Sequence, residues 1–167
     1  MRIGVDIGGT KIEAIVLGPN GTELVRERIA SPQGNYAATL ASVKNLVNIV
    51  ETRATRIKRA KRPATIGIGI PGIISPATGL VKNANSTWLI GHQLDQDLTE
   101  IFKRPIKVAN DANCFAMSEA IDGAAMGYQT VFAVILGTGV GGGLCVAGKI
   151  LTGLNAIAGE WGHNPLP

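Results

Sequence analysis

The chain has 167 residues, 46% of them apolar and 17% charged, so it has enough apolar side chains to bury a core, which excludes a disordered protein. Its 16 basic and 12 acidic residues give a formal net charge of +4, which on its own would suggest nucleic-acid binding. Six of the basic residues lie between positions 53 and 62, however, and without them ten basic residues face twelve acidic ones. No base-reading motif accompanies this local cluster, so we expect no nucleic-acid partner.

Cysteine usage and hydropathy restrict the cellular setting. Cys114 and Cys145 show neither a C-x-x-C spacing nor a Cys/His ligand spacing, which is typical of a reducing, cytoplasmic environment. The apolar run at 131–136 is too short to span a bilayer, and six glycines between 131 and 148 disfavour a helix there. We therefore expect no membrane partner.

The first seventy residues predict strands, then a helix, then another strand. Ranges 3–8, 12–18 and 23–30 are β-type runs separated by turns, with Asn20-Gly21 as a hairpin signal. Within 36–54 the apolar residues recur at steps of four and three, which is one face of a helix. The members of this face are Tyr36, Leu40, Val43, Val47 and Val50. Range 65–70 predicts a strand that Pro71-Gly72 ends.

The rest of the chain repeats part of this pattern. After a loop, we expect a helix near 94–103, a strand at 105–109 and a helix at 111–122. Residues 130–137 predict a strand, a glycine-rich loop follows, and 143–147 predicts a strand that turns at Gly148-Lys149 into a shorter one. The succession of apolar strand, glycine turn and apolar strand resembles the start of the chain. We predict an α/β protein with a first domain over 1–120 and the beginning of a second over 121–167.

The first glycine turn is Asp6-Ile7-Gly8-Gly9-Thr10-Lys11. Backbone N–H groups at such a turn can face an anion, Thr10 adds a hydroxyl and Lys11 a positive charge. Asp6 could orient Mg²⁺ through water. An ordinary hairpin turn with a solvated lysine is the alternative, but an acid inside an apolar strand needs a partner or a function.

The second glycine turn is Gly137-Thr138-Gly139-Val140-Gly141-Gly142-Gly143, which matches G-x-G-x-x-G. A Rossmann dinucleotide site would require a helix directly after the glycines, whereas the sequence continues as strand-like residues. The pattern therefore indicates a glycine turn between antiparallel strands. Two such turns in one chain indicate a phosphate chain held from both sides.

Asp111 follows a predicted strand and begins a predicted helix. One of Asn110 and Asp111 could simply cap this helix. Ligands also bind at the carboxyl ends of strands in α/β sheets, and a carboxylate there could accept a hydroxyl proton during phosphoryl transfer. Farther along, Glu160 and His163 are three residues apart and could hold sugar hydroxyls or a metal.

Five motifs in order carry a resemblance to a known family. They are DIGGTK at 6–11, GIPG at 69–72, NDAN at 110–113, GTGVGGG at 137–143 and AGEWGH at 158–163. Together they resemble the ROK family of sugar kinases and related transcriptional repressors, which has the actin/hexokinase-like (ribonuclease H-like) mixed-sheet fold. The segments VKNANSTWL at 81–89 and EWGHNPLP at 160–167 look most like its fructokinase or manno(fructo)kinase branch.

The resemblance implies ATP-dependent phosphorylation of a hexose (fructose, mannose or glucose) at the 6-hydroxyl. It implies that Asp111 is the general base, that Asn110, Glu160 and His163 bind the sugar, and that Asp6 lies near Mg²⁺. It further implies a homodimer and a structural Zn²⁺ for which His163 is a candidate ligand. The residues that it assigns to the ATP phosphates are Gly8, Gly9, Thr10, Lys11, Gly137, Thr138, Gly139, Gly141 and Gly142.

Two alternatives remain at this stage: a ROK-type transcriptional regulator and a non-catalytic sugar-binding fragment. A regulator of this family carries a helix-turn-helix domain ahead of the first motif, whereas here the first strand begins near residue 2. Family members continue for well over a hundred further residues, including the remaining zinc ligands. We therefore expect an N-terminal part of a kinase whose activity in isolation is doubtful.

Overall fold

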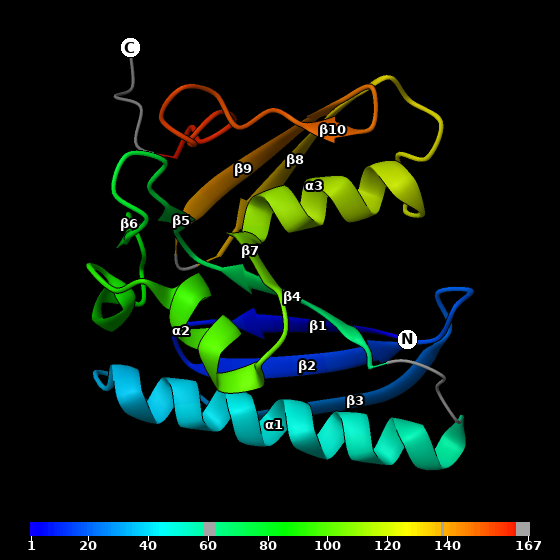
Figure 1. Ribbon diagram of the computed structural model, residues 1–167. Coiled ribbons are helices and arrows are strands. Elements are labelled where there is room, and N and C mark those ends of the chain that lie inside the picture. The colour runs from blue at the N-terminus through cyan, green and yellow to red at the C-terminus, as the bar shows by residue number, and fades with distance from the viewer. Residues whose placement is uncertain (59–62, 138, 163–167) are drawn as a thin grey trace.

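The computed structural model describes residues 1–58, 63–137 and 139–162. A five-stranded sheet forms the first half of the molecule (Figure 1). Its strands, in spatial order, are β3 (Glu23–Ala30), β2 (Lys11–Leu17), β1 (Arg2–Ile7), β4 (Thr65–Ile70) and β7 (Ile106–Asn110). β1, β2 and β3 form an antiparallel meander, while β4 and β7 run parallel to β1. This is the mixed sheet that the fold prediction requires.

Two helices cover one face of this sheet. α1 (Tyr36–Ile57) packs on β1, β2 and β3, and α2 (Leu94–Phe102) packs on β7. α1 begins where the Asn35 side chain accepts a hydrogen bond from the Ala38 N–H at 2.9 Å. Alternate residues of the strands point into the core beneath the helices, as the twofold period of a strand requires. The largest buried side chains there include Ile7, Ile12, Leu46, Ile68, Leu94 and Leu98.

The region between β4 and α2 contains structure that the sequence patterns did not reveal. β5 (Ile73–Ile74) and β6 (Val81–Lys82) pair as a short antiparallel hairpin, and a single 3-10 turn follows at Thr87–Leu89. The Trp88 indole N–H donates to the Thr39 hydroxyl of α1 at 3.0 Å. This hydrogen bond attaches the loop after β6 to α1.

The second half contains a helix and a three-stranded sheet. α3 (Asp111–Ile121) packs against β8 (Thr130–Leu136) and β9 (Val140–Val146), and β10 (Lys149–Ile150) pairs with β9. The β8–β9 hairpin repeats the antiparallel pairing of β1 with β2, and β10 takes the place of β3. Figure 1 shows this sheet and α3 on the side of the five-stranded sheet opposite α1.

The predicted glycine loop before residue 143 is shorter than expected, because β9 begins at Val140. The reason is close packing. A methyl group on Gly143 would lie 2.3 Å from the Ala112 carbonyl oxygen, and one on Gly142 would lie 2.3 Å from the Gly159 carbonyl oxygen. Gly142 and Gly143 are strand residues that neighbouring backbone approaches closely, and β8 ends at Leu136 while β9 begins at Val140.

Within the described ranges, no helix is both long enough and apolar enough to cross a membrane. Cys114 is exposed, Cys145 is buried in α3's interface with the second sheet, and both are free thiols. Domain limits at residue 120 stay a prediction. α3 lies mainly against β8 and β9, although it still touches β4 and β7.

Candidate active site

Two aspartates line one cavity on either side of a glycine, at the carboxyl ends of three neighbouring strands. Asp6 on β1 pairs in register with Gly69 on β4, and Asp111 follows directly after β7. A methyl group on Gly69 would lie 3.8 Å from Asp6 Oδ1 and 3.8 Å from the Asp111 Cα. Gly69 thus leaves open space beside the Asp6 carboxylate and the Asp111 backbone, and the fold brings together two residues that are 105 positions apart.

The carboxyl groups of both residues are weaker acids than usual. Asp6 is accessible to solvent, but the cavity walls remove part of its hydration, and this raises its pKa. The negative charges of Asp111 and Glu13 raise the pKa of Asp6 further, whereas Arg28 acts in the opposite direction. For Asp111, loss of hydration likewise raises the pKa, against a lowering contribution from backbone N–H groups that include that of Ala112. Both acids therefore hold a proton more readily than an exposed aspartate.

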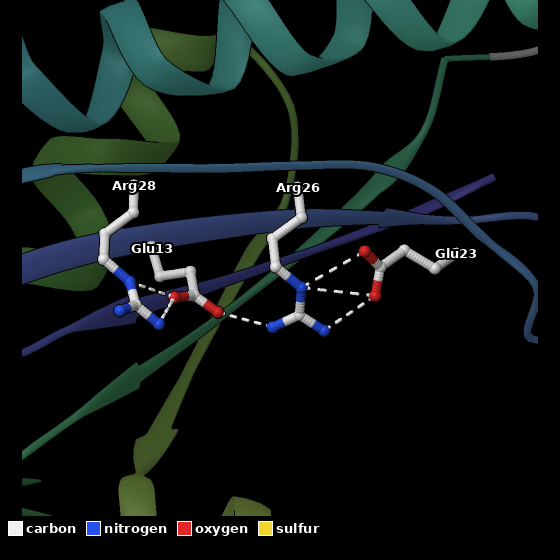
Figure 2. A network of polar contacts seen from close by, with 4 residues as sticks. All are labelled: Glu13, Glu23, Arg26 and Arg28. Carbon is white, nitrogen blue, oxygen red and sulfur yellow. Dashed lines mark hydrogen bonds and ion pairs between the residues drawn. The ribbon is translucent and has the colours of Figure 1, made fainter.

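A network of two arginines and two glutamates lies on β2 and β3, next to Asp6. Glu13 on β2 lies opposite Asp6 on β1 and opposite Arg28 on β3. Figure 2 shows Glu13 between Arg26 and Arg28, with Glu23 on the outer side of Arg26. Burial acts to raise the pKa of Glu13, but the hydrogen bonds from Arg26 and Arg28 outweigh it and hold that pKa below its usual range. Glu13 is consequently paired, as a carboxylate, with the positive charges of Arg26 and Arg28.

The first glycine turn joins β1 to β2 directly after Asp6. The Gly8 N–H donates to the Lys11 carbonyl at 2.9 Å, and a methyl group on Gly8 would lie only 3.1 Å from that oxygen. The carbonyl of Gly9 accepts from the Gln33 side chain at 3.0 Å, and that of Thr10 accepts from the Ser31 N–H at 2.9 Å. These bonds fix the turn, and the side chains of Thr10 and Lys11 are exposed.

The second glycine turn lies on the wall of a cavity of about 870 Å³ between the two halves of the molecule. Gly137, Gly139 and Gly141 line this cavity from one side, and Asn110 and Asp111 line it from the other. A second cavity of about 480 Å³ lies over β1 and β4 and is lined by Asp6, Glu13, Asp111 and Cys114 among others. Asp111 is thus at the junction of the two cavities.

The capping role that the sequence left open belongs to Asn110. Its side-chain oxygen accepts from the Asn113 N–H at 3.0 Å, and its amide donates to the Gly72 carbonyl at 3.3 Å. Asn110 is buried, so it holds the start of α3 against the loop after β4. Asp111 is therefore not the N-cap residue of α3. One of its carboxylate oxygens still accepts a hydrogen bond from the Ala112 N–H at 2.7 Å.

The remaining predicted residues fall into three groups. Glu160 lines the larger cavity, and its carboxylate lies near Gly141, since a methyl group on Gly141 would be 3.7 Å from Glu160 Oε2. Gly142 is buried and packs on Gly159, so a phosphate-binding role for it stays a prediction. Thr138 and His163 lie outside the described residues.

The structure also places at the cavity three residues that lie within the quoted segments but had no role assigned to them. Asn83 and Asn85, from the loop after β6, line it together with Trp161. Two asparagines spaced by one residue are a weak pattern in a loop, and no spacing rule connects them with a turn more than fifty residues away. Among the described residues there is no group of three or more His, Cys, Asp or Glu that could hold a metal ion.

Comparisons with known proteins lead to one family. The family model described as the ROK family matches residues 2–167. The N-acetyl-D-glucosamine kinase of Yersinia pestis bv. Antiqua (strain Nepal516) is 41% identical over the whole chain, which covers 63% of that protein. Several further relatives of the same name are covered to 53%, so the chain spans little more than half the length of these curated proteins.

Solved structures lead to the same family. A ROK family glucokinase from Streptomyces griseus, in complex with glucose and AMPPNP, has a TM-score of 0.83 and 30% identity over 99% of this chain and 51% of its own. A ROK family transcriptional regulator, described as a homologue of the E. coli MLC protein, has a TM-score of 0.80 at 21% identity, over 98% of this chain and 41% of its own. That second likeness shows the fold alone. With the motifs, the mixed sheet and the family model in agreement over nearly every residue, the chain belongs to the ROK family.

Proposed function

We propose that this chain forms the sugar- and phosphate-binding cleft of an ATP-dependent sugar kinase that phosphorylates a 6-hydroxyl group. The observation that carries the proposal is the position of Asp111 at the junction of two cavities. One cavity offers a carboxylate, Asp6, beside the first glycine turn. The other is lined by the second glycine turn, Glu160 and Trp161, and is large enough for a hexose.

In the proposed reaction, Asp111 acts as the general base. Its carboxylate accepts the proton of the 6-hydroxyl group as that oxygen forms a bond to the γ-phosphorus of ATP. The bond between the γ-phosphorus and the β–γ bridging oxygen breaks, and ADP leaves with the electron pair. The raised pKa of Asp111 suits this task, because it makes the carboxylate a stronger base than an exposed aspartate.

The carboxylates present fit a magnesium ion. Asp6 and Asp111 line one cavity, and burial and the charge of Asp111 both raise the pKa of Asp6. Hard oxygen ligands of this kind are what Mg²⁺ binds, together with phosphate oxygens and water. When bound, Mg²⁺ would supply positive charge to the phosphates, and Asp6 would hold it. Thr10, Lys11 and the glycines of both turns would contact the phosphate chain.

The candidate sugars are N-acetyl-D-glucosamine, glucose, mannose and fructose. N-acetyl-D-glucosamine takes first place, because relatives at 41% identity carry that activity in their names, whereas the glucokinase is 30% identical. Glu160 would accept hydrogen bonds from sugar hydroxyls, and the face of Trp161 would pack on the sugar ring. Asn110 would support the site by holding the Gly72 loop.

The test is the full-length gene product assayed with MgATP and these four sugars. We expect turnover with at least one of them, and we expect Asp111→Asn to lower kcat by about 10²–10⁴-fold while the fold and sugar binding persist. Asp122→Asn is the matched control, since Asp122 is exposed at the other end of α3. It should leave kcat unchanged.

Each alternative predicts a different outcome. Near-normal turnover of Asp111→Asn would remove this residue from the reaction. Sugar binding by calorimetry without phosphorylation would support a non-catalytic sugar-binding protein. A salt-sensitive, sequence-selective shift of DNA would support a transcriptional regulator, whose fold the chain shares.

A further inference from the structure

β8 is apolar on both of its faces, but the described residues bury only one of them. Successive side chains of a strand point to opposite faces of the sheet. On the face toward α3, Val131 and Ala133 are buried in a cluster with Ala116. The intervening apolar side chains are exposed and form what we call the open face. Its members are Phe132 (51% exposed), Val134 (37%) and Leu136 (74%).

The composition of this hairpin is that of a buried sheet. No charged residue occurs anywhere from 130 to 146, and the run at 131–136 is apolar at every position. Such uninterrupted apolar strands are typical of sheets that are covered on both faces. The segment at 159–162 approaches β9, since a methyl group on Gly142 would lie 2.3 Å from the Gly159 carbonyl oxygen. The side chains of the open face nevertheless remain exposed beside this segment, so its burial calls for a further element.

The first hairpin of the chain shows what kind of element this is. A glycine follows β1 directly, as one follows β8, so the two strands can be aligned on Gly8 and Gly137. In this alignment the open face corresponds to three β1 residues that are at most 4% exposed, namely Ile3, Val5 and Ile7. Their cover is α1, which follows the third strand of the meander and packs back on β1 and β2. The equivalent cover in the second half is a helix that follows β10.

The described residues after β10, at 151–162, contain no helix. The curated relatives of which this chain covers 53% contain almost as much polypeptide again outside the matched part. A longer gene product of that size has ample length for the missing helix. The repeat therefore indicates an occupant from the same polypeptide in preference to a second copy of the chain.

We propose that the open face is the docking surface for an amphipathic helix encoded after residue 167, which packs on β8 and β9 as α1 packs on β1 and β2. The apolar stripe of this helix buries the three open-face side chains, and its polar side faces solvent. This inference concerns assembly of the second half and does not depend on the proposed kinase function.

The first test places a thiol on the open face of the full-length gene product. Val134→Cys keeps a small apolar side chain, and its reaction with a maleimide is followed by mass spectrometry of the peptide that contains it. We expect labelling to be about 100-fold slower in the folded protein than in denaturant. Ile49→Cys is the matched control, because Ile49 is 43% exposed on α1, and its labelling should slow by less than about tenfold. Protection at position 134 no greater than at position 49 would overturn the proposal.

A second test identifies the occupant. Phe132 is replaced by the photoreactive aromatic residue p-benzoylphenylalanine in the full-length gene product, which is then irradiated. The proposal requires a cross-linked product with the mass of one chain, joined to a peptide after residue 167 whose apolar residues recur at helical spacing. A product with the mass of two chains would identify a second copy as the occupant and overturn the proposal. A cross-link to a peptide within 1–167 of the same chain would overturn it as well.

Discussion

At the scale of single residues, the main feature of the site is two aspartates that line one cavity. Asp6 and Asp111 flank Gly69 and line the same cavity, and each has its pKa raised, chiefly by loss of hydration. The folded protein therefore carries an electrostatic cost at neutral pH, which is common where a site is prepared for a cation or a proton.

This cost predicts a pH-dependent gain in stability for Asp111→Asn. Because the pKa of Asp111 is raised on folding, its contribution to stability is complete below the unfolded value of about 3.8 and is lost as the pH rises through the folded pKa. At pH 7 the amide variant should thus have a higher Tm than the wild type, and the difference should vanish below about pH 3.8, where both side chains are neutral.

Thermal unfolding from pH 3 to 8 checks this, with the exposed Asp122→Asn as the comparison at the same helix. A lower Tm of Asp111→Asn at pH 7 would show that the Asp111 carboxylate stabilises the fold instead. A gain that persisted unchanged at pH 3 would show a cause other than its charge.

At the scale of elements, glycines decide whether α3 and β9 can meet. Gly142 and Gly143 face backbone carbonyls of Gly159 and Ala112, so neither tolerates a Cβ without movement of the chain. Gly141, only one residue earlier, has its nearest atoms at 3.7 Å, which is ordinary contact. Glycine is therefore required by close packing at positions 142 and 143 but not at position 141.

The contrast gives a matched pair of variants. Gly142→Ala should destabilise the protein by about 1–3 kcal/mol, the usual cost of forcing extra volume into a packed interior. Gly141→Ala should change the free energy of unfolding by much less. Denaturant unfolding of both variants measures the difference, and equal values would show that β9 and the 159–160 segment separate at little cost.

At the scale of the whole molecule, one ion pair connects segments distant in sequence. Arg104, after α2, donates to both carboxylate oxygens of Glu51 on α1 at 2.8 and 2.7 Å, and to the Ala64 carbonyl at 3.0 Å. The side chains are 20% and 24% exposed, so solvent screens them only in part. The hydrogen bonds from Arg104 hold the pKa of Glu51 below its usual value.

Glu51→Gln should therefore destabilise the protein by about 1–3 kcal/mol at pH 7. A lowered folded pKa contributes stability above the unfolded value near 4.5, and that contribution is lost as the pH falls through the folded pKa. The deficit should accordingly shrink in acid. Glu100→Gln is the control, because Glu100 pairs with Lys103 at 3.9 Å with both side chains 79% exposed, and it should change stability by less than about 0.5 kcal/mol. A deficit for Glu51→Gln that is no larger than the control's would show that the pair does not hold these segments together.

The molecule as a whole has the start of a repeated architecture. β8, β9 and β10 reproduce the hairpin order of β1, β2 and β3, and we propose that they begin a second domain of the same type. β8 forms one edge of this sheet, and its exposed side chains include Phe132, Val134 and Leu136. We also retain as proposals the homodimer and the zinc role of His163.

The sequence by itself determined the succession of strands and helices. Apolar residues recur every two residues in a strand and every 3.6 residues in a helix, and glycine and proline end these elements, so each signal depends on a few neighbouring residues. It placed β3, β4 and the start of α1 at their observed residues, and its motifs led to the family. Tertiary structure alone decided that Asn110 and not Asp111 caps α3, which glycines are packing contacts, and that Asn85 lies on the wall of the larger cavity. Those outcomes depend on distances between segments far apart in the chain, and no local pattern of residues encodes such distances.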